Sequence, residues 1–100
     1  MRSSELIEGA LALLGPNGEN WVKGSDIHLP SKLCIVLAIA EMQPTVTVFR
    51  QAKKYLAKAA GLKPNENQSL AIWNDQDHIQ WSDIKRAMET AAQAAKEQGD

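Results

Sequence analysis

The chain has 100 residues, a formal net charge of −1 and a pI of about 6.1, which is the size of a single domain. Its 44% hydrophobic and 23% charged residues match a folded globular protein and exclude a disordered or fibrous one. The near-neutral charge excludes the global attraction that most nucleic-acid-binding proteins use, so any contact with phosphates has to be local.

Thiol content and hydropathy predict a cytoplasmic protein. Cys34 is the only cysteine, so no intramolecular disulfide forms, as is typical of reducing compartments. Glu5 and Glu8 interrupt the apolar residues near the N-terminus, which is unlike a signal peptide. The longest apolar run, Leu33 to Ala40, is too short to span a bilayer. We therefore expect no role in a membrane.

The first predicted helix begins near Ser3 and ends at Leu14. Ser3 and Ser4 carry hydroxyls that can accept backbone N–H bonds at a helix start. Apolar residues then recur at helical spacing until Gly15-Pro16 ends the helix. Gly9 within this helix predicts a close crossing by another helix, since it has no side chain.

The segment from Gly15 to Pro30 has turn residues and no helical period, which predicts a structured loop with room for one short extended segment. Trp21 in this loop is interpreted as an anchor that folds the loop back onto the core. The next segment, Leu33 to Ala40, is apolar on every side and bounded by prolines. It predicts a second helix at the centre of the core.

From Thr45 to Ala60 an apolar stripe alternates with charged positions, which predicts an amphipathic surface helix. The stripe consists of Val48, Phe49, Ala52, Tyr55, Leu56 and Ala59. A polar loop then leads into the segment from Ser69 to Asp75. The last helix is predicted from Gln80 to about Gln98, with Asp83 capping its start, and the tail Gly99-Asp100 is expected to fray.

These elements predict one domain spanning residues 1–100 and a mostly all-α fold. Its architecture is expected to be a compact bundle of about four helices with a structured loop. Neither an internal repeat nor a low-complexity tract is visible in the sequence.

Three short stretches stand in order along the chain: Asn20-Trp21-Val22-Lys23-Gly24, Leu33 to Ala38, and Ile72-Trp73-Asn74-Asp75. They resemble the Gly-Trp-x-x-Gly segment, the Cys-bearing helix and the Trp-Asn-Asp signature of a family of small domains, without assigned activity, found in phage and actinobacterial proteins. The chain departs from that pattern at Asn20, where Gly is usual, and at Ile79-Gln80, where Arg-Thr is usual. The resemblance implies a compact fold and a phage or mobile-element origin, and it supplies no catalytic residues.

Asp75, Asp77 and Asp83 form an acidic group just before and within the first turn of the last helix. Such a group typically complements a helix N-terminus, and it also makes a negative surface suited to mimicking phosphates or docking on a basic groove. In Trp73-Asn74-Asp75 the Asn and Asp side chains are expected to bond local backbone N–H groups while the tryptophan packs.

Metal binding and catalysis have weaker support. Four residues within a nine-residue stretch carry metal-ligating groups: Asp75, Asp77, His78 and Asp83. Their spacing matches neither an EF-hand nor a zinc motif, so a metal-dependent hydrolase is a weak alternative and no metal or cofactor is predicted. Cys34 could pair with His28 or His78, but an apolar run solvates a thiolate poorly. The sequence also lacks a phosphate loop and a nucleophile elbow, so we predict that the protein is not an enzyme.

Arg50, Lys53, Lys54 and Lys58 share a face of the helix predicted from Thr45 to Ala60, since residues three and four apart lie side by side on a helix. This face is interpreted as a solvated charged surface, or as a basic stripe that contacts either the backbone of DNA or RNA or an acidic protein. No aromatic residue is expected on its exposed side.

The leading hypothesis is a small phage- or mobile-element-type protein that binds stoichiometrically to a larger host protein or ribonucleoprotein complex. An example is an inhibitor of a host defence system such as a CRISPR surveillance complex, contacted through the acidic group. Size, the missing catalytic constellation and the segregated charges motivate this hypothesis, while the phage origin depends on the resemblance alone. The alternative is a nucleic-acid-binding accessory domain that uses the basic stripe.

Overall fold

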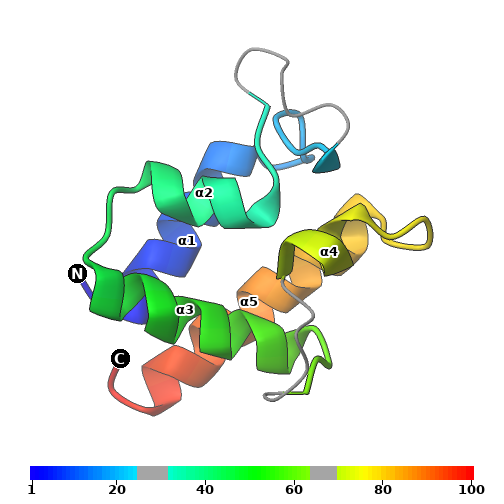
Figure 1. The fold of residues 1–100 in the computed structure, drawn as a ribbon. Helices are drawn as coiled ribbons and strands as arrows, with labels where there is room; N and C mark the ends of the chain where they lie inside the picture. Colours follow the sequence, from blue (N-terminus) through cyan, green and yellow to red (C-terminus); the bar gives the residue numbers. More distant parts are fainter. Residues whose placement is uncertain (25–31, 64–69) are drawn as a thin grey trace.

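Five helices form the part of the chain that the computed structural model describes, which is residues 1–24, 32–63 and 70–100 (Figure 1). They are α1 (Ser3–Leu14), α2 (Ile35–Glu41), α3 (Val46–Ala59), α4 (Leu70–Asp75) and α5 (Trp81–Glu97). No strand occurs in these ranges, so the predicted all-α fold is confirmed. None of the described helices is long and apolar enough to cross a membrane.

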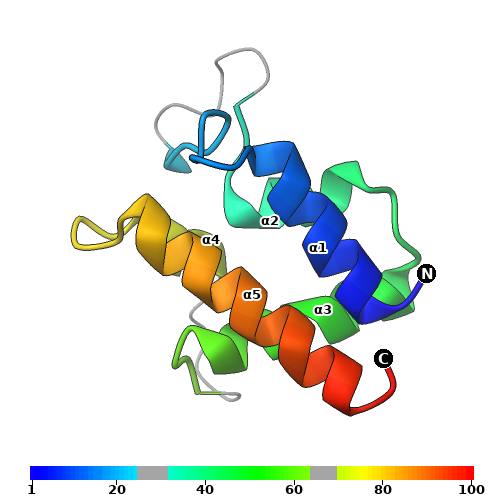
Figure 2. The ribbon, with the colours of Figure 1, turned by 180° about the vertical axis from the view of Figure 1, so that it is seen from behind.

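The centre of the core lies where α1, α3 and α5 pack together (Figure 1, Figure 2). The fully buried apolar residues of these helices are Leu6, Ile7, Ala10 and Leu14 of α1, Ala52 and Leu56 of α3, and Ile84, Met88, Ala91 and Ala95 of α5. They recur at helical spacing, so each helix has one buried face, as the apolar stripes predict. Removing this apolar surface from water is the main source of stability, at roughly 25 cal/mol per Å².

The second helix, α2, lies against one side of α1 and not at the centre of the core, so that prediction was wrong. Its buried residues are Ile35, Ala38 and Ile39. Leu37, on another face, is 37% exposed. The reason is that α1 and α5 pack directly on each other, so α2 packs on the side of α1 and, less extensively, against α4 and α3. A Cβ at Gly9 would collide with the side chain of Met42, just after α2, so this glycine makes room for a side chain and not for the close helix crossing that was predicted.

The fourth helix, α4, was not predicted, because six residues are too few for a helical period to be recognised. It packs against α2 and α3. Within the described residues, the loop after α1 forms one isolated parallel β-bridge, between Trp21 and Leu33. The anchoring role predicted for Trp21 is confirmed, since the half-buried ring packs on the core and its centroid lies 6.2 Å from that of Trp81.

The chain ends do not fray as expected, because the tail docks on the start of α1 (Figure 1). The Ser3 backbone N–H donates to Oδ1 of Asp100 at 3.1 Å, and the Ser4 N–H donates to the Asp100 backbone oxygen at 2.9 Å. The Ser4 hydroxyl donates to the same oxygen at 3.0 Å, so it does not accept a backbone N–H as predicted. Two orphan donors of the first helical turn are therefore satisfied by the other end of the chain.

These bonds make the stability contribution of Asp100 dependent on pH. The hydrogen bond from the Ser3 backbone N–H lowers the pKa of Asp100, because it stabilises the ionised carboxylate. A lowered pKa in the folded state adds stability above the unfolded-state pKa, and this stability is lost as pH falls through the folded-state pKa.

We expect Asp100→Asn to lower the melting temperature by only about 2 °C at neutral pH, since the group is partly exposed and its interactions are screened. The difference from wild type should shrink as pH falls through the folded-state pKa of Asp100, which lies below its usual value, and it should vanish once the carboxylate is protonated in both the folded and the unfolded state. Thermal unfolding followed by circular dichroism across this pH range tests the prediction. Glu89→Gln, at an exposed position of α5, is the control. A difference that stays constant with pH would contradict the assignment.

Candidate functional site

A buried asparagine, Asn74, joins three segments that lie far apart in the sequence. Its Oδ1 accepts the Nε1–H of Trp21 at 2.7 Å and the backbone N–H of Ile35 at 3.1 Å. Its Nδ2 donates to the carbonyl of Val22 at 3.1 Å and to Oδ1 of Asp75 at 3.0 Å. The side chain is fully buried, so these bonds are shielded from water. Asn74 therefore holds the loop, the start of α2 and the end of α4 together.

Asp75 extends this network to the next part of the loop. The carboxylate Oδ1 that accepts from Asn74 also accepts the backbone N–H of Gly24 at 2.6 Å, across 51 positions of sequence. We predicted that the Asn74 and Asp75 side chains bond backbone groups near them in the sequence. That prediction was wrong, because the backbone groups they bond belong to Val22, Gly24 and Ile35. The predicted packing of Trp73 is confirmed, since the side chain is only 8% exposed. Asp75 is exposed but is bonded within the chain.

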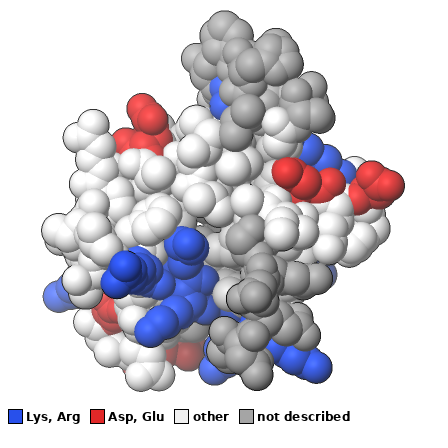
Figure 3. Space-filling view, in the orientation of Figure 1, with Lys and Arg blue, Asp and Glu red and all other residues white. Residues whose placement is uncertain are grey.

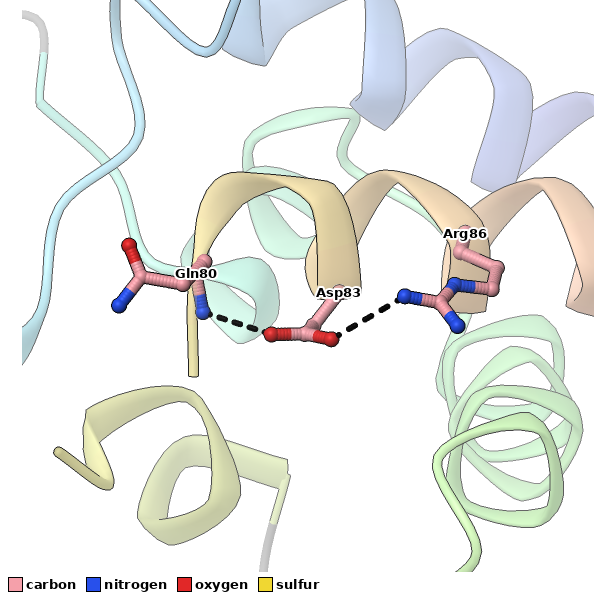
Figure 4. Close-up of polar contacts among 3 residues, drawn as sticks. All are labelled: Gln80, Asp83 and Arg86. Carbon is pink, nitrogen blue, oxygen red and sulfur yellow. Dashed lines mark hydrogen bonds and ion pairs between the residues drawn. The ribbon is translucent and has the colours of Figure 1, made fainter. Parts of the chain in front are cut away.

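The other two members of the acidic group differ from each other. Asp83 caps α5 as predicted: its Oδ2 accepts the backbone N–H of Gln80 at 2.8 Å (Figure 4). Its Oδ1 lies 3.3 Å from the guanidinium Nη2 of Arg86, one turn further along (Figure 4). Asp77 is exposed on the turn between α4 and α5. Two of the three predicted contact residues, Asp75 and Asp83, are thus already engaged in bonds that hold the fold.

The metal-ligating residues do not gather into a site. Among the residues that the structure describes, no three His, Cys, Asp or Glu side chains lie together so that they could hold a metal ion. The four candidates were Asp75, Asp77, His78 and Asp83. Asp75 faces the loop at Gly24, whereas Asp83 faces the start of α5, so closeness in sequence does not bring the carboxylates to one point.

The predicted candidate nucleophile, Cys34, is 5% exposed and immediately precedes α2. His78 is exposed on the turn before α5. The other candidate base, His28, lies outside the described residues. The side chain of Cys34 belongs to the packed interior, where a thiolate is poorly solvated.

The side chains of the basic stripe lie on the solvent-facing side of α3. Figure 3 shows Lys and Arg atoms gathered over this helix with a few acidic atoms at their lower border, and a separate acidic group near the far end of α4. Arg50, Lys54 and Lys58 are exposed and Lys53 is half-buried. None of the four forms an ion pair with a carboxylate of the described residues. We refer to these four residues as the basic face of α3.

An aromatic ring of the apolar stripe lies beside the basic face, at the margin between the two. Phe49 is half-buried, and the ammonium of Lys53 lies 5.2 Å from the centre of its ring. The predicted apolar stripe of α3 packs on the core: Ala52 and Leu56 are fully buried, and the other members, Phe49 among them, are partly buried against the core. A cation over an aromatic face contributes roughly 0.5–1 kcal/mol at an exposed site, and it orients the Lys53 side chain.

Two hollows open on the surface of the described chain. The larger, of about 650 Å³, lies between α1 and α5 and has Leu11, Pro16 and Trp81 among its walls. The smaller, of about 280 Å³, lies where the C-terminal end of α3 meets α4 and α5. Its lining residues are Ala59, Ala60, Trp73, His78, Ile79, Asp83, Arg86, Ala87 and Thr90. We call this smaller hollow the α3–α5 pocket.

No family model, no curated protein and no solved structure matches this chain. The resemblance to a phage and actinobacterial domain family therefore stays a prediction.

Proposed function

We propose that this protein is a nucleic-acid-binding domain and that the basic face of α3 contacts the phosphate backbone. The observation that carries the proposal is that four cations lie on one helix face without a carboxylate partner among the described residues. Arg50 and Lys58 are eight residues apart, or about 12 Å along a helix, a length over which a nucleic-acid backbone presents several phosphates. Unpaired cations at this spacing favour a polyanionic partner.

The acidic group supports a partner less well. Asp75 accepts from Gly24, and Asp83 accepts from Gln80 and pairs with Arg86. Docking these carboxylates on a basic groove would compete with the Gly24 bond that holds the loop and with the ion pair between Asp83 and Arg86. The hypothesis of an inhibitor that occupies a host defence complex stays a prediction, and a ribonucleoprotein target would also present RNA to the basic face. A metal-dependent hydrolase has the least support, because its candidate ligands do not gather.

The test measures binding of fluorescein-labelled DNA and RNA by anisotropy as a function of salt. Counterion release predicts that affinity falls steeply with salt, with a slope that decreases by about 0.7 to 0.9 for each phosphate contact removed. We expect the variant with all four residues of the basic face changed to Gln to lose most of its affinity at low salt and to have a nearly flat salt dependence.

Lys85→Gln is the matched control, because Lys85 is an exposed lysine on α5 outside the basic face. It should bind as wild type does, and both variants should melt within a few degrees of wild type. The proposal fails if wild type binds neither duplex nor single strand at low salt. It also fails if the fourfold variant retains wild-type affinity and salt dependence.

A further inference from the structure

The α3–α5 pocket has the chemistry of a site for a flat polar ring. One carboxylate, Asp83, and one guanidinium, Arg86, line it together with the rings of Trp73 and His78. Figure 4 shows Asp83 and Arg86 on the side of α5 that faces α3 and α4. Asp83 accepts two hydrogen bonds, whereas an ionised carboxylate has about four acceptor positions, so it can still accept from a ligand. Arg86 is 73% exposed and has further N–H donors.

The pocket adjoins the end of the basic face. Lys58 is the last cation of that face, and the next two residues, Ala59 and Ala60, form one wall of the pocket. A backbone that follows α3 toward its C-terminal end therefore arrives at the mouth of the pocket. A volume of about 280 Å³ can hold one planar heterocycle but not a base pair together with its backbone.

We propose that the nucleic acid is single-stranded and that one unpaired base enters the α3–α5 pocket while its phosphates lie on the basic face. Single strands can splay a base out of the stack, whereas a duplex has to break a pair to do so. The carboxylate of Asp83 accepts hydrogen bonds only, so it can accept from an exocyclic amino group or from a ring N–H of the base, and Arg86 offers donors and a flat surface for stacking. This inference depends on the function proposed above.

The test compares three ligands with the same number of phosphates: a short oligo(dC), a short oligo(dT) and an oligomer of abasic sugar phosphates. We expect wild type to bind oligo(dC) at least about tenfold more tightly than the abasic oligomer, since stacking one base on a protein surface has an effect of this size. Oligo(dT) should likewise bind more tightly than the abasic oligomer, because thymine presents its ring N3–H to the carboxylate and its carbonyls to Arg86.

Thr90→Tyr fills the pocket from the exposed side of α5, and Ser82→Tyr places the same ring at an exposed position outside it. The first variant should lose the preference for oligo(dC) over the abasic oligomer and keep the affinity for the abasic backbone. The second should keep both. Melting temperatures close to that of wild type establish that both variants fold.

The outcomes separate this inference from the proposed function. If wild type binds the abasic oligomer as tightly as oligo(dC), or a duplex as tightly as a single strand, the basic face still binds phosphates and only the pocket assignment fails. If Thr90→Tyr keeps the full preference for oligo(dC), the pocket is likewise excluded as the base site. If wild type binds none of these ligands at low salt, the proposed function fails as well.

Discussion

Replacing Asn74 with alanine is expected to lower the free energy of unfolding by about 4 kcal/mol, because each buried polar group left without a partner costs roughly 1–3 kcal/mol. The change removes the acceptor for Trp21 Nε1–H and for the Ile35 N–H, and it removes a donor to the Val22 carbonyl. For a domain of this size the melting temperature should fall by about 15 to 30 °C. Thermal unfolding followed by circular dichroism measures the fall.

Asn17→Ala is the control, because Asn17 is exposed in the turn after α1. It should change the stability by less than about 0.5 kcal/mol. A variant at Asn74 that melts as the control does would mean that water replaces the lost side chain and that the network contributes little. Fluorescence of the tryptophans gives a second measurement, since Trp21 loses its hydrogen-bond partner in the Asn74 variant only.

Trp73→Ala is expected to lower the free energy of unfolding by about 3 to 5 kcal/mol, since it removes a large aromatic side chain that is 8% exposed. The lost free energy has two parts. One is the hydrophobic stabilisation that burial of the ring provided, and the other is the cost of the cavity that remains between α4 and its neighbours. Urea unfolding followed by circular dichroism measures the free energy of unfolding. An unchanged dependence of this free energy on urea concentration confirms that the variant exposes as much surface on unfolding as wild type does.

Val46→Ala, at a position 64% exposed on α3, is the matched control and should change stability little. If Trp73→Ala kept wild-type stability and abolished binding of nucleic acid, the tryptophan would be a contact residue and its structural role would be wrong.

Local patterns predicted the long helices well. The apolar period of α1, α3 and α5 and the Gln80–Asp83 cap are properties of neighbouring residues, and the structure confirms them. Two errors came from interactions between distant residues. Nothing near Asp100 indicates that α1 will supply N–H donors to it, and nothing near Asn74 indicates that its partners are Trp21 and Ile35.

The candidate site was predicted in part. The four cations of α3 were predicted to share a face, because helical spacing alone places them together, and they are adjacent in the structure. The α3–α5 pocket was not predicted, since its walls come from three helices and a turn whose packing is decided by tertiary contacts. The sequence signal that could have indicated Asn74 is one amide between a tryptophan and an aspartate at the end of a short apolar segment.

The packing of α1 directly on α5 has a consequence for how the chain folds during synthesis. Leu6, Ile7, Ala10 and Leu14 are made early, but much of the surface that covers them belongs to the last helix. At about 5–20 residues per second, this apolar face waits several seconds for its partner after leaving the ribosome. Contacts between such distant residues also slow closure of the core relative to a bundle of sequential helices. The nascent chain is therefore most prone to aggregate, and most dependent on chaperones, in the interval before α5 emerges.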